Sequence, residues 1–247
     1  MFAIFRKEIN GFFSSLTGYI VIIVFLLINS LFMWIFPGEW NIFDNGYAGL
    51  DTLFFISPWV FLFLVPAITM RMIAEENRLG TMELIYSRPI SERGIIWGKY
   101  LASVALVLLA LLPCIIYYIS VYLLGETPGN LDKGGTWGAF IGLFFLASVY
   151  ASAGIFASSL TDNQVIAFII AVLFCFVLFM GFDSIAYLPG LKNLDEFVIR
   201  LGIIEHYKSI SRGVLDIKDA AYFMAVVILF IEATRLRLLS RKWMKKS

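Results

Sequence analysis

The sequence predicts an all-α fold, that of a polytopic membrane protein with six transmembrane helices in one domain of residues 1–247. Hydrophobic residues make up 60% of the chain and charged residues only 15%, whereas soluble domains are about half apolar and about a quarter charged. Several apolar runs also reach the length of about 20 residues that a helix needs to cross a bilayer. The formal net charge of +1 argues against a nucleic-acid-binding surface, which is strongly basic.

Residues 1–16 are predicted to form an amphipathic helix in the inner headgroup layer. Apolar side chains recur at helical spacing from Phe2 to Leu16, while Arg6 and Lys7 lie on the other face. A short basic helix of this kind typically lies in the plane of the membrane interface. Two interpretations are open: a plain anchor, and an element that acts together with the cytoplasmic loop described below.

Six apolar segments follow, and each is predicted to span the membrane. They cover residues 17–36, 53–72, 95–124, 137–159, 164–187 and 220–239. Pro66 in the second segment and Pro113 in the third each remove a backbone hydrogen bond, which produces a static kink or a flexible point. Small residues in the fourth segment indicate close packing, within the chain or between two copies; they are Gly138, Gly142, Ala147, Ala151 and Gly154.

Basic residues orient these segments across the membrane. Most of the 19 Lys and Arg residues lie near the N-terminus, in the loop after the second segment and in the C-terminal tail, whereas the connection 37–51 has none. By the positive-inside rule both termini are then cytoplasmic, which requires an even number of spans. The sixth segment has an apolar core of only about a dozen residues. It crosses only if Arg235 and Arg237 extend toward the interface.

The polar loop 73–94 joins the second and third segments on the cytoplasmic side. Gly80 is expected to end the helix that extends out of the second segment, because glycine adopts the left-handed conformation of a C-terminal cap. Thr81 is expected to cap a new helix, and Glu83 in its first turn complements the positive end of the helix dipole. Ser91 is expected to cap the start of the third segment.

Pro89 is expected to end this new helix, since a proline disfavours helical geometry at the residue before it, here Arg88. The helix would have two turns, on the order of 10 Å, and it would not be stable alone in water. It carries apolar side chains beside charged neighbours: Met82, Leu84, Ile85 and Tyr86. A solvated turn without a partner and a rigid element that docks into a partner protein are both open.

The sequence lacks the residues of several catalytic sites. No glycine-rich Lys-Ser/Thr phosphate loop occurs, so this chain is not expected to be an ATPase or another enzyme. His206 is the single histidine, which argues against a histidine metal cage and a serine–histidine protease site. Lys99, Asp183 and Glu232 are expected within reach of the membrane boundaries, whereas secondary transporters place charges or broken helices near the midplane.

Two motifs resemble those of one family. The loop region carries Glu75-Glu76-x-x-x-Gly80-Thr81-x-Glu83-Leu84, Arg88-Pro89-Ile90-Ser91 and Gly98-Lys99-Tyr100, and Gly213-Val214-Leu215-Asp216 precedes the last segment. These motifs resemble the signature of ABC-2-type permeases, the membrane subunits of one class of ATP-binding-cassette exporters. The resemblance extends over the whole chain. The most similar subgroup is that of the gliding-motility-associated ABC permeases, and permeases of the nitrous-oxide-reductase maturation type are nearly as similar.

The resemblance implies that residues 81–87 form a coupling helix, seated in a cleft of a separate ATP-binding subunit. The residues that it assigns to this transmission site are Glu75, Glu76, Gly80, Thr81, Glu83, Leu84 and Pro89. Two copies of that subunit would bind ATP and Mg²⁺, and this chain would bind no cofactor.

The resemblance also implies a larger complex in the bacterial inner membrane. A second permease-type subunit, or a membrane companion with a large extracytoplasmic domain, would complete it. Residues 188–218 would form short helices in the outer leaflet that cover the exit of the pathway; a structural helix on the surface is the alternative. The complex would export a substrate, or act mechanically on envelope partners without transport. A secondary transporter is the remaining alternative, disfavoured by the position of the charges.

Overall fold

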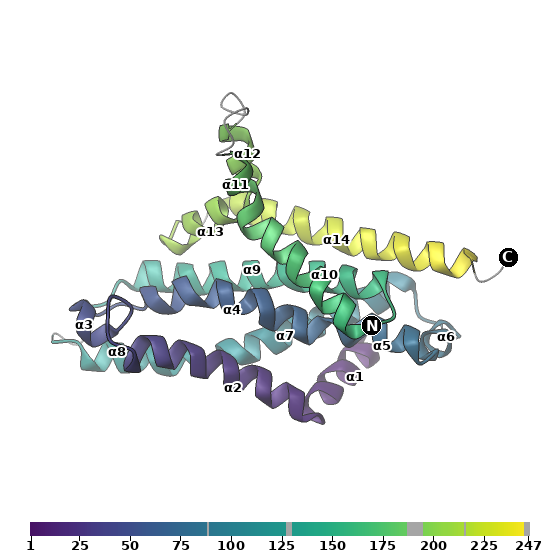
Figure 1. Cartoon of the computed structure of the whole chain (residues 1–247), viewed down its shortest axis with the longest axis horizontal. Coiled ribbons are helices and arrows are strands. Elements are labelled where there is room, and N and C mark those ends of the chain that lie inside the picture. Colours follow the sequence, from purple (N-terminus) through teal and green to yellow (C-terminus); the bar gives the residue numbers. More distant parts are fainter. Residues whose placement is uncertain (88, 127–129, 187–194, 215, 245–247) are drawn as a thin grey trace.

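Figure 1 shows the fold in a computed structural model, which describes residues 1–87, 89–126, 130–186, 195–214 and 216–244. In this part of the chain every regular element is a helix, as the sequence predicts. The first helices are α1 (Phe2–Phe13), α2 (Leu16–Ser30), the π-helical turn η1 (Leu31–Ile35), α3 (Ile42–Asn45), α4 (Asp51–Thr69), α5 (Arg71–Arg78), α6 (Thr81–Tyr86), α7 (Glu92–Leu111) and α8 (Cys114–Leu124). The others are α9 (Lys133–Leu160), α10 (Gln164–Phe176), the π-helical turn η2 (Val177–Gly181), α11 (Phe182–Ala186), α12 (Asp195–Leu201), α13 (Ile203–Ser211) and α14 (Ile217–Met244).

Five helical segments of the described residues are long and apolar enough to cross a membrane: Gly18–Ile35, Asp51–Arg78, Glu92–Leu124, Lys133–Leu160 and Gln164–Ala186. They coincide with the first five predicted segments, so the prediction of several membrane-spanning helices is confirmed. The sixth predicted segment lies within α14, a continuous helix of 28 residues. At 1.5 Å per residue such a helix is about 42 Å long. Its crossing of the membrane stays a prediction.

Helix α9 lies at the centre of the bundle, where it contacts α4, α7, α10, α13 and α14. Its small residues make these contacts close. A Cβ atom added at Gly154 would overlap the hydroxyl of Thr69 in α4, and one added at Gly138 would overlap the carbonyl oxygen of Ile210 in α13. The small residues at Gly138 and Gly154 therefore serve packing within this chain.

The two prolines affect the helices differently. Pro113 divides the third segment, because α7 ends at Leu111 and α8 begins at Cys114. Pro66 lies inside α4, which ends three residues later at Thr69. Pro113 thus lies at a helix interruption and Pro66 lies near one, and neither residue has the N–H group that an interior helical residue donates. Flexing at either point stays a prediction.

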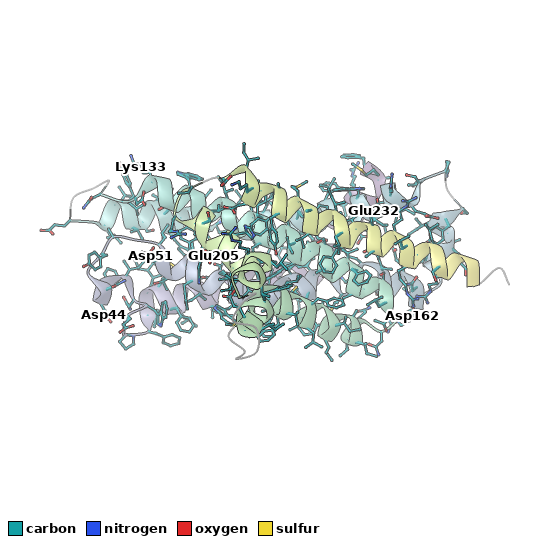
Figure 2. The ribbon with its side chains drawn as sticks, turned by 90° about the horizontal axis from the view of Figure 1, so that it is seen from above. Asp44, Asp51, Lys133, Asp162, Glu205 and Glu232 are labelled. Atoms are coloured by element: carbon teal, nitrogen blue, oxygen red, sulfur yellow. The ribbon has the colours of Figure 1, made fainter. Side chains whose placement is uncertain are left out.

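The segments that the sequence assigns to the cytoplasm lie together at one end of the bundle. Figure 1 shows the N-terminus, α6 and the C-terminal end of α14 at this end. Figure 2 shows Asp162 and Glu232 toward the same end. Two ion pairs join α14 to the bundle there, Arg241 to Asp162 at 2.6 Å and Arg93 to Glu232 at 3.1 Å. The N-terminus, the loop with α6 and the C-terminal tail carry most of the basic residues, and they lie at the same end of the bundle. The topology prediction requires this arrangement, because it places all three on one side of the membrane.

The described part of the connection 188–218 contains two short helices, α12 and α13, which are separated at Gly202. Helix α13 packs on α9, and its Ile204 and Tyr207 side chains are buried. The hydroxyl of Tyr207 donates to the carbonyl oxygen of Phe54 in α4 at 2.8 Å. Residues 188–194, the first part of this connection, lie outside the described residues. In its described part, this connection is anchored in the core of the bundle.

Candidate functional site

The loop between α4 and α7 contains the short helix that its turn chemistry predicts. Helix α5 ends at Arg78, and Gly80 adopts a left-handed φ of 69°. This geometry confirms Gly80 as the stop signal, since residues with a Cβ rarely adopt it. Helix α6 has six residues and is therefore about 9 Å long.

Thr81 does not cap α6, contrary to the sequence-based expectation. The cap position belongs to Gly80, and Thr81 is the first helical residue, without a side-chain cap. Its hydroxyl points back to α5, where it donates to the carbonyl oxygen of Glu76 at 3.4 Å. The reason is that Gly80 alone makes the chain reversal, so Thr81 already has helical geometry.

The C-terminal side of the loop follows the sequence signals. Helix α6 ends at Tyr86, and the hydroxyl of Ser87 donates to the carbonyl oxygen of Leu84 at 2.9 Å. Ser91 caps α7, because its hydroxyl accepts from the backbone N–H of Gly94 at 3.1 Å. Arg88 lies outside the described residues, and Pro89 is exposed.

Helix α6 has a buried face and an exposed face. Met82 is only 4% exposed, and Tyr86 is half-buried against the core. Burial raises the pKa of Tyr86 to about 12, so its phenol is neutral at physiological pH. Leu84, by contrast, is 67% exposed, and Leu79 in the preceding turn is 61% exposed. Together with the exposed Glu83, they form what we call the α6 face: Leu79, Glu83 and Leu84.

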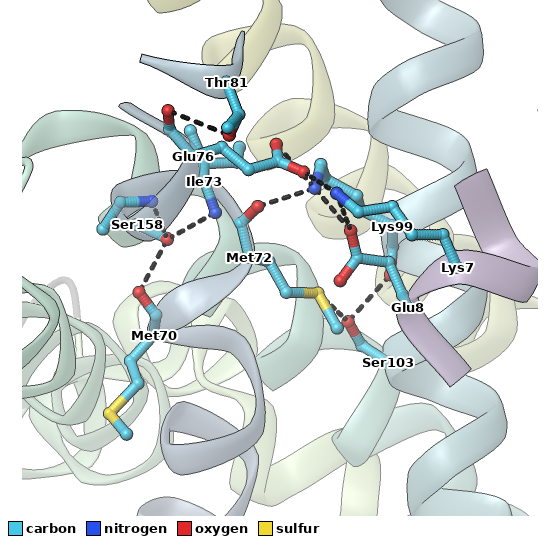
Figure 3. Close-up of polar contacts among 11 residues, drawn as sticks. Lys7, Glu8, Met70, Met72, Ile73, Glu76, Thr81, Lys99, Ser103 and Ser158 are labelled. Carbon is cyan, nitrogen blue, oxygen red and sulfur yellow. Dashed lines mark hydrogen bonds and ion pairs between the residues drawn. The ribbon is translucent and has the colours of Figure 1, made fainter. Parts of the chain in front are cut away.

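A second group of charged residues lies between three helices (Figure 3). We call it the ion network: Lys7 and Glu8 of α1, Glu76 of α5 and Lys99 of α7. Glu76 and Lys99 are buried at its centre, whereas the Lys7 side chain at its edge is 58% exposed. The Nζ atom of Lys99 lies 2.6 Å from Glu8 Oε1, 2.9 Å from Glu76 Oε2 and 2.6 Å from the carbonyl oxygen of Met72. Lys7 pairs with the other carboxylate oxygen, Oε1, of Glu76.

Lys99 is the most deeply buried member of the network, with 0% of its side chain exposed, which the sequence did not predict. Its position near a membrane boundary stays a prediction. Burying an unpaired ammonium group costs several kcal/mol, and here acceptors from α1 and α5 surround it. Burial of the Lys7 ammonium lowers its pKa, but the hydrogen bond to Glu76 and the nearby acidic charges outweigh this and raise the pKa above its usual value. Both cations are thus held by the carboxylates of neighbouring helices.

The junction of α4 and α5 is bound to α9 through Ser158, a residue that the sequence did not single out. The hydroxyl of Ser158 accepts from the backbone N–H groups of Ile73 and Ala74 at 3.0 Å each, and it donates to the carbonyl oxygen of Met70 at 2.9 Å. This hydroxyl therefore serves three backbone groups where α5 begins (Figure 3). One signal in the sequence could have identified Ser158. It lies four residues after Gly154, so both residues are on the same face of α9, and Gly154 approaches Thr69 at the end of α4.

The structure divides the residues predicted for the transmission site into two sets. Gly80, Glu83, Leu84 and Pro89 are exposed, whereas Glu76 is buried within the ion network. Glu75 and Thr81 are half-buried and line a cavity of about 480 Å³ between α1, α4 and α5, together with Lys7, Glu76 and Arg71.

Sequence reasoning missed Glu8 because its partner, Lys99, is 91 residues away along the chain. Among the described residues, no three His, Cys, Asp or Glu side chains gather as a metal site.

Comparison with known families gives one match. Residues 41–204, more than half of the chain, match the family described as ABC-2 family transporter protein. The matched region begins before α3 and ends at the start of α13, so it includes α5, α6 and the Lys99 region of α7. No curated protein matches the chain.

Proposed function

The chain belongs to the ABC-2 family of transporter proteins, and from this premise we propose that it is the permease subunit of an ATP-driven exporter or envelope machine. A separate ATP-binding subunit would bind α6 and move it when ATP is bound and hydrolysed. The observation that carries this proposal is the α6 face, which presents exposed Glu83 and Leu84 on the short helix α6 and exposed Leu79 in the turn before it, between two long apolar segments.

The geometry of α6 suits the transfer of movement. A helix this short is unstable alone, but it is joined to α5 by a single turn at Gly80 and pinned by the buried Met82. Exposed apolar residues that lie together mark interaction sites on protein surfaces, and Leu79 and Leu84 are both exposed in this loop. Any displacement of α6 would therefore reach α5 and the membrane helices directly.

The membership supports a partner that hydrolyses ATP, because this sequence has no phosphate-binding loop of its own. We propose two copies of this partner, which would hold ATP and Mg²⁺, and a second permease-type subunit or a companion with a large extracytoplasmic domain. The grouping of basic segments at one end supports cytoplasmic termini in the bacterial inner membrane and a sixth crossing by α14. A role in gliding motility is proposed from sequence resemblance alone, and purely mechanical work on envelope partners is the alternative to export.

The test is co-expression of this chain with an ATP-binding-cassette subunit encoded beside it. We expect the two proteins to co-purify and the ATPase rate to depend on this chain. Leu84→Glu should abolish both effects while the protein still inserts, because Leu84 is 67% exposed and supports no core packing. The matched control is Val214→Glu, at an apolar residue of similar exposure (60%) in the connection 188–218, outside the predicted membrane segments. Normal assembly and ATPase stimulation with Leu84→Glu would refute the assignment of α6.

A further inference from the structure

Helix α1 has an exposed surface and an inward surface. Phe2 is 74% exposed, as expected for a helix that lies against lipid. Ile4 and Phe12 point inward and are buried, and Glu8, four residues from each, lies on the same inward face. A plain membrane anchor needs only the first surface. A carboxylate on the inward face requires a partner, and Lys99 is that partner.

The inward surface of α1 packs on α7 at Gly98, the residue before Lys99. A Cβ atom added at Gly98 would lie 3.0 Å from the carbonyl oxygen of Met1 and 3.1 Å from Cβ of Ile4. This close approach fixes the distance between the two helices. It also places Glu8 one turn along α1 from Ile4, where its carboxylate reaches the Lys99 ammonium at 2.6 Å.

One nitrogen atom therefore joins three helices. Lys99 belongs to α7, Glu8 to α1, and Glu76 and the Met72 carbonyl group to α5. Charge pairs are much stronger in such a buried site than at the surface, because the local dielectric constant is low. The link is also independent of the covalent path from α5 to α4, which passes through the one-residue turn at Met70.

We propose that the ion network makes α1 part of the moving unit, with Lys99, Glu8 and Glu76 as positioning residues. Movement of α6 passes through α5 to Lys99, and from there to α7 and α1 together. Helix α1 is then a rigid component of transmission and not only an anchor. This inference rests on the proposed function, because it assumes that α6 is the element that a partner displaces.

The first test removes the contribution of α1 alone. Glu8→Leu extends the inward apolar face between Ile4 and Phe12 and leaves Lys99 paired with Glu76 and Met72, so the protein should fold. A spin label at Gly11→Cys reports the mobility of α1, because a side chain there meets nothing within 4 Å. The two native cysteines, Cys114 and Cys175, are buried and should not be labelled.

We expect Glu8→Leu to increase the mobility of the label and to reduce stimulation of the partner ATPase by about fivefold or more, the usual range of coupling between sites. Co-purification with the partner should remain. Lys99→Met/Glu76→Gln, which neutralises the core of the network as a pair, should have the same effects. The matched control, Asp162→Asn/Arg241→Gln, removes one exposed ion pair at the same end of the bundle and should change neither the mobility nor the stimulation.

The outcomes separate this inference from the proposed function. An immobile label in both network variants would overturn the lock between α1 and α7. A mobile label with full ATPase stimulation would show that α1 is only an anchor. Loss of co-purification in the variants, but not in the natural sequence, would assign the network to assembly instead of transmission. If the natural sequence itself fails to bind or stimulate the partner, the proposed function is wrong, while the mobility result still tests the lock.

Discussion

Replacing Ser158 with alanine should destabilise the protein at the junction between α4 and α5. Its hydroxyl accepts from two buried backbone N–H groups, at Ile73 and Ala74, and donates to the Met70 carbonyl group. Leaving a buried donor without a partner costs about 1–3 kcal/mol. Two donors are affected, and helical carbonyl groups one turn back can take over part of the bonding. We therefore expect a loss of about 2–4 kcal/mol in the free energy of unfolding.

The neighbouring Ser159 is a matched control for this change. It is in the same helix and is also 0% exposed, but its hydroxyl only donates to the carbonyl oxygen of Phe156 in its own helix, at 2.6 Å. Ser159→Ala removes one donor and leaves no buried N–H group without a partner, so its cost should stay near 1 kcal/mol or below, roughly the net value of one hydrogen bond.

Thermal unfolding of the detergent-solubilised protein measures the difference. For a chain of this size, 1 kcal/mol corresponds to about 2–4 °C in Tm, so Ser158→Ala should lower Tm by roughly 5–15 °C and Ser159→Ala by only a few degrees. Equal Tm values for the two variants would refute the claim that Ser158 holds the junction.

Two further changes test the packing of α9 and the hydrogen bonds of His206. Gly154→Ala should destabilise the protein by about 1–3 kcal/mol, because its Cβ would overlap the Thr69 hydroxyl; adding Thr69→Ala should recover part of the loss in Tm, and no recovery would place the strain elsewhere. His206→Phe should lower the free energy of unfolding by about 1–3 kcal/mol, since its Nδ1 lies 2.7 Å from Asp219 Oδ1 and its Nε2 lies 2.9 Å from the Arg200 carbonyl oxygen. A phenyl ring keeps the shape but neither contact, so an unchanged Tm would show that these hydrogen bonds add nothing.

Local signals in the sequence were sufficient to predict the long helical segments and the turn and cap residues of the loop 73–94. Apolar runs longer than the bilayer thickness located five long helical segments. Gly80 and Ser91 were found because each acts on its own backbone within three or four residues, by a left-handed φ or by a side-chain cap. Thr81 was misassigned as the cap because Gly80 and Thr81 both suit that position, and only the geometry distinguishes them.

The ion network and the Ser158 contact depend on residues that are far apart along the chain. Lys99 is 91 residues from Glu8 and 27 from Met72, and Ser158 is 85 residues from Ile73. The composition of the chain determined a helical membrane protein, since apolar helices are the form in which such a chain satisfies its backbone in lipid. Which charges are buried, and which helices they join, was decided only by tertiary packing, because the partners of these side chains lie on other helices that are far away along the chain.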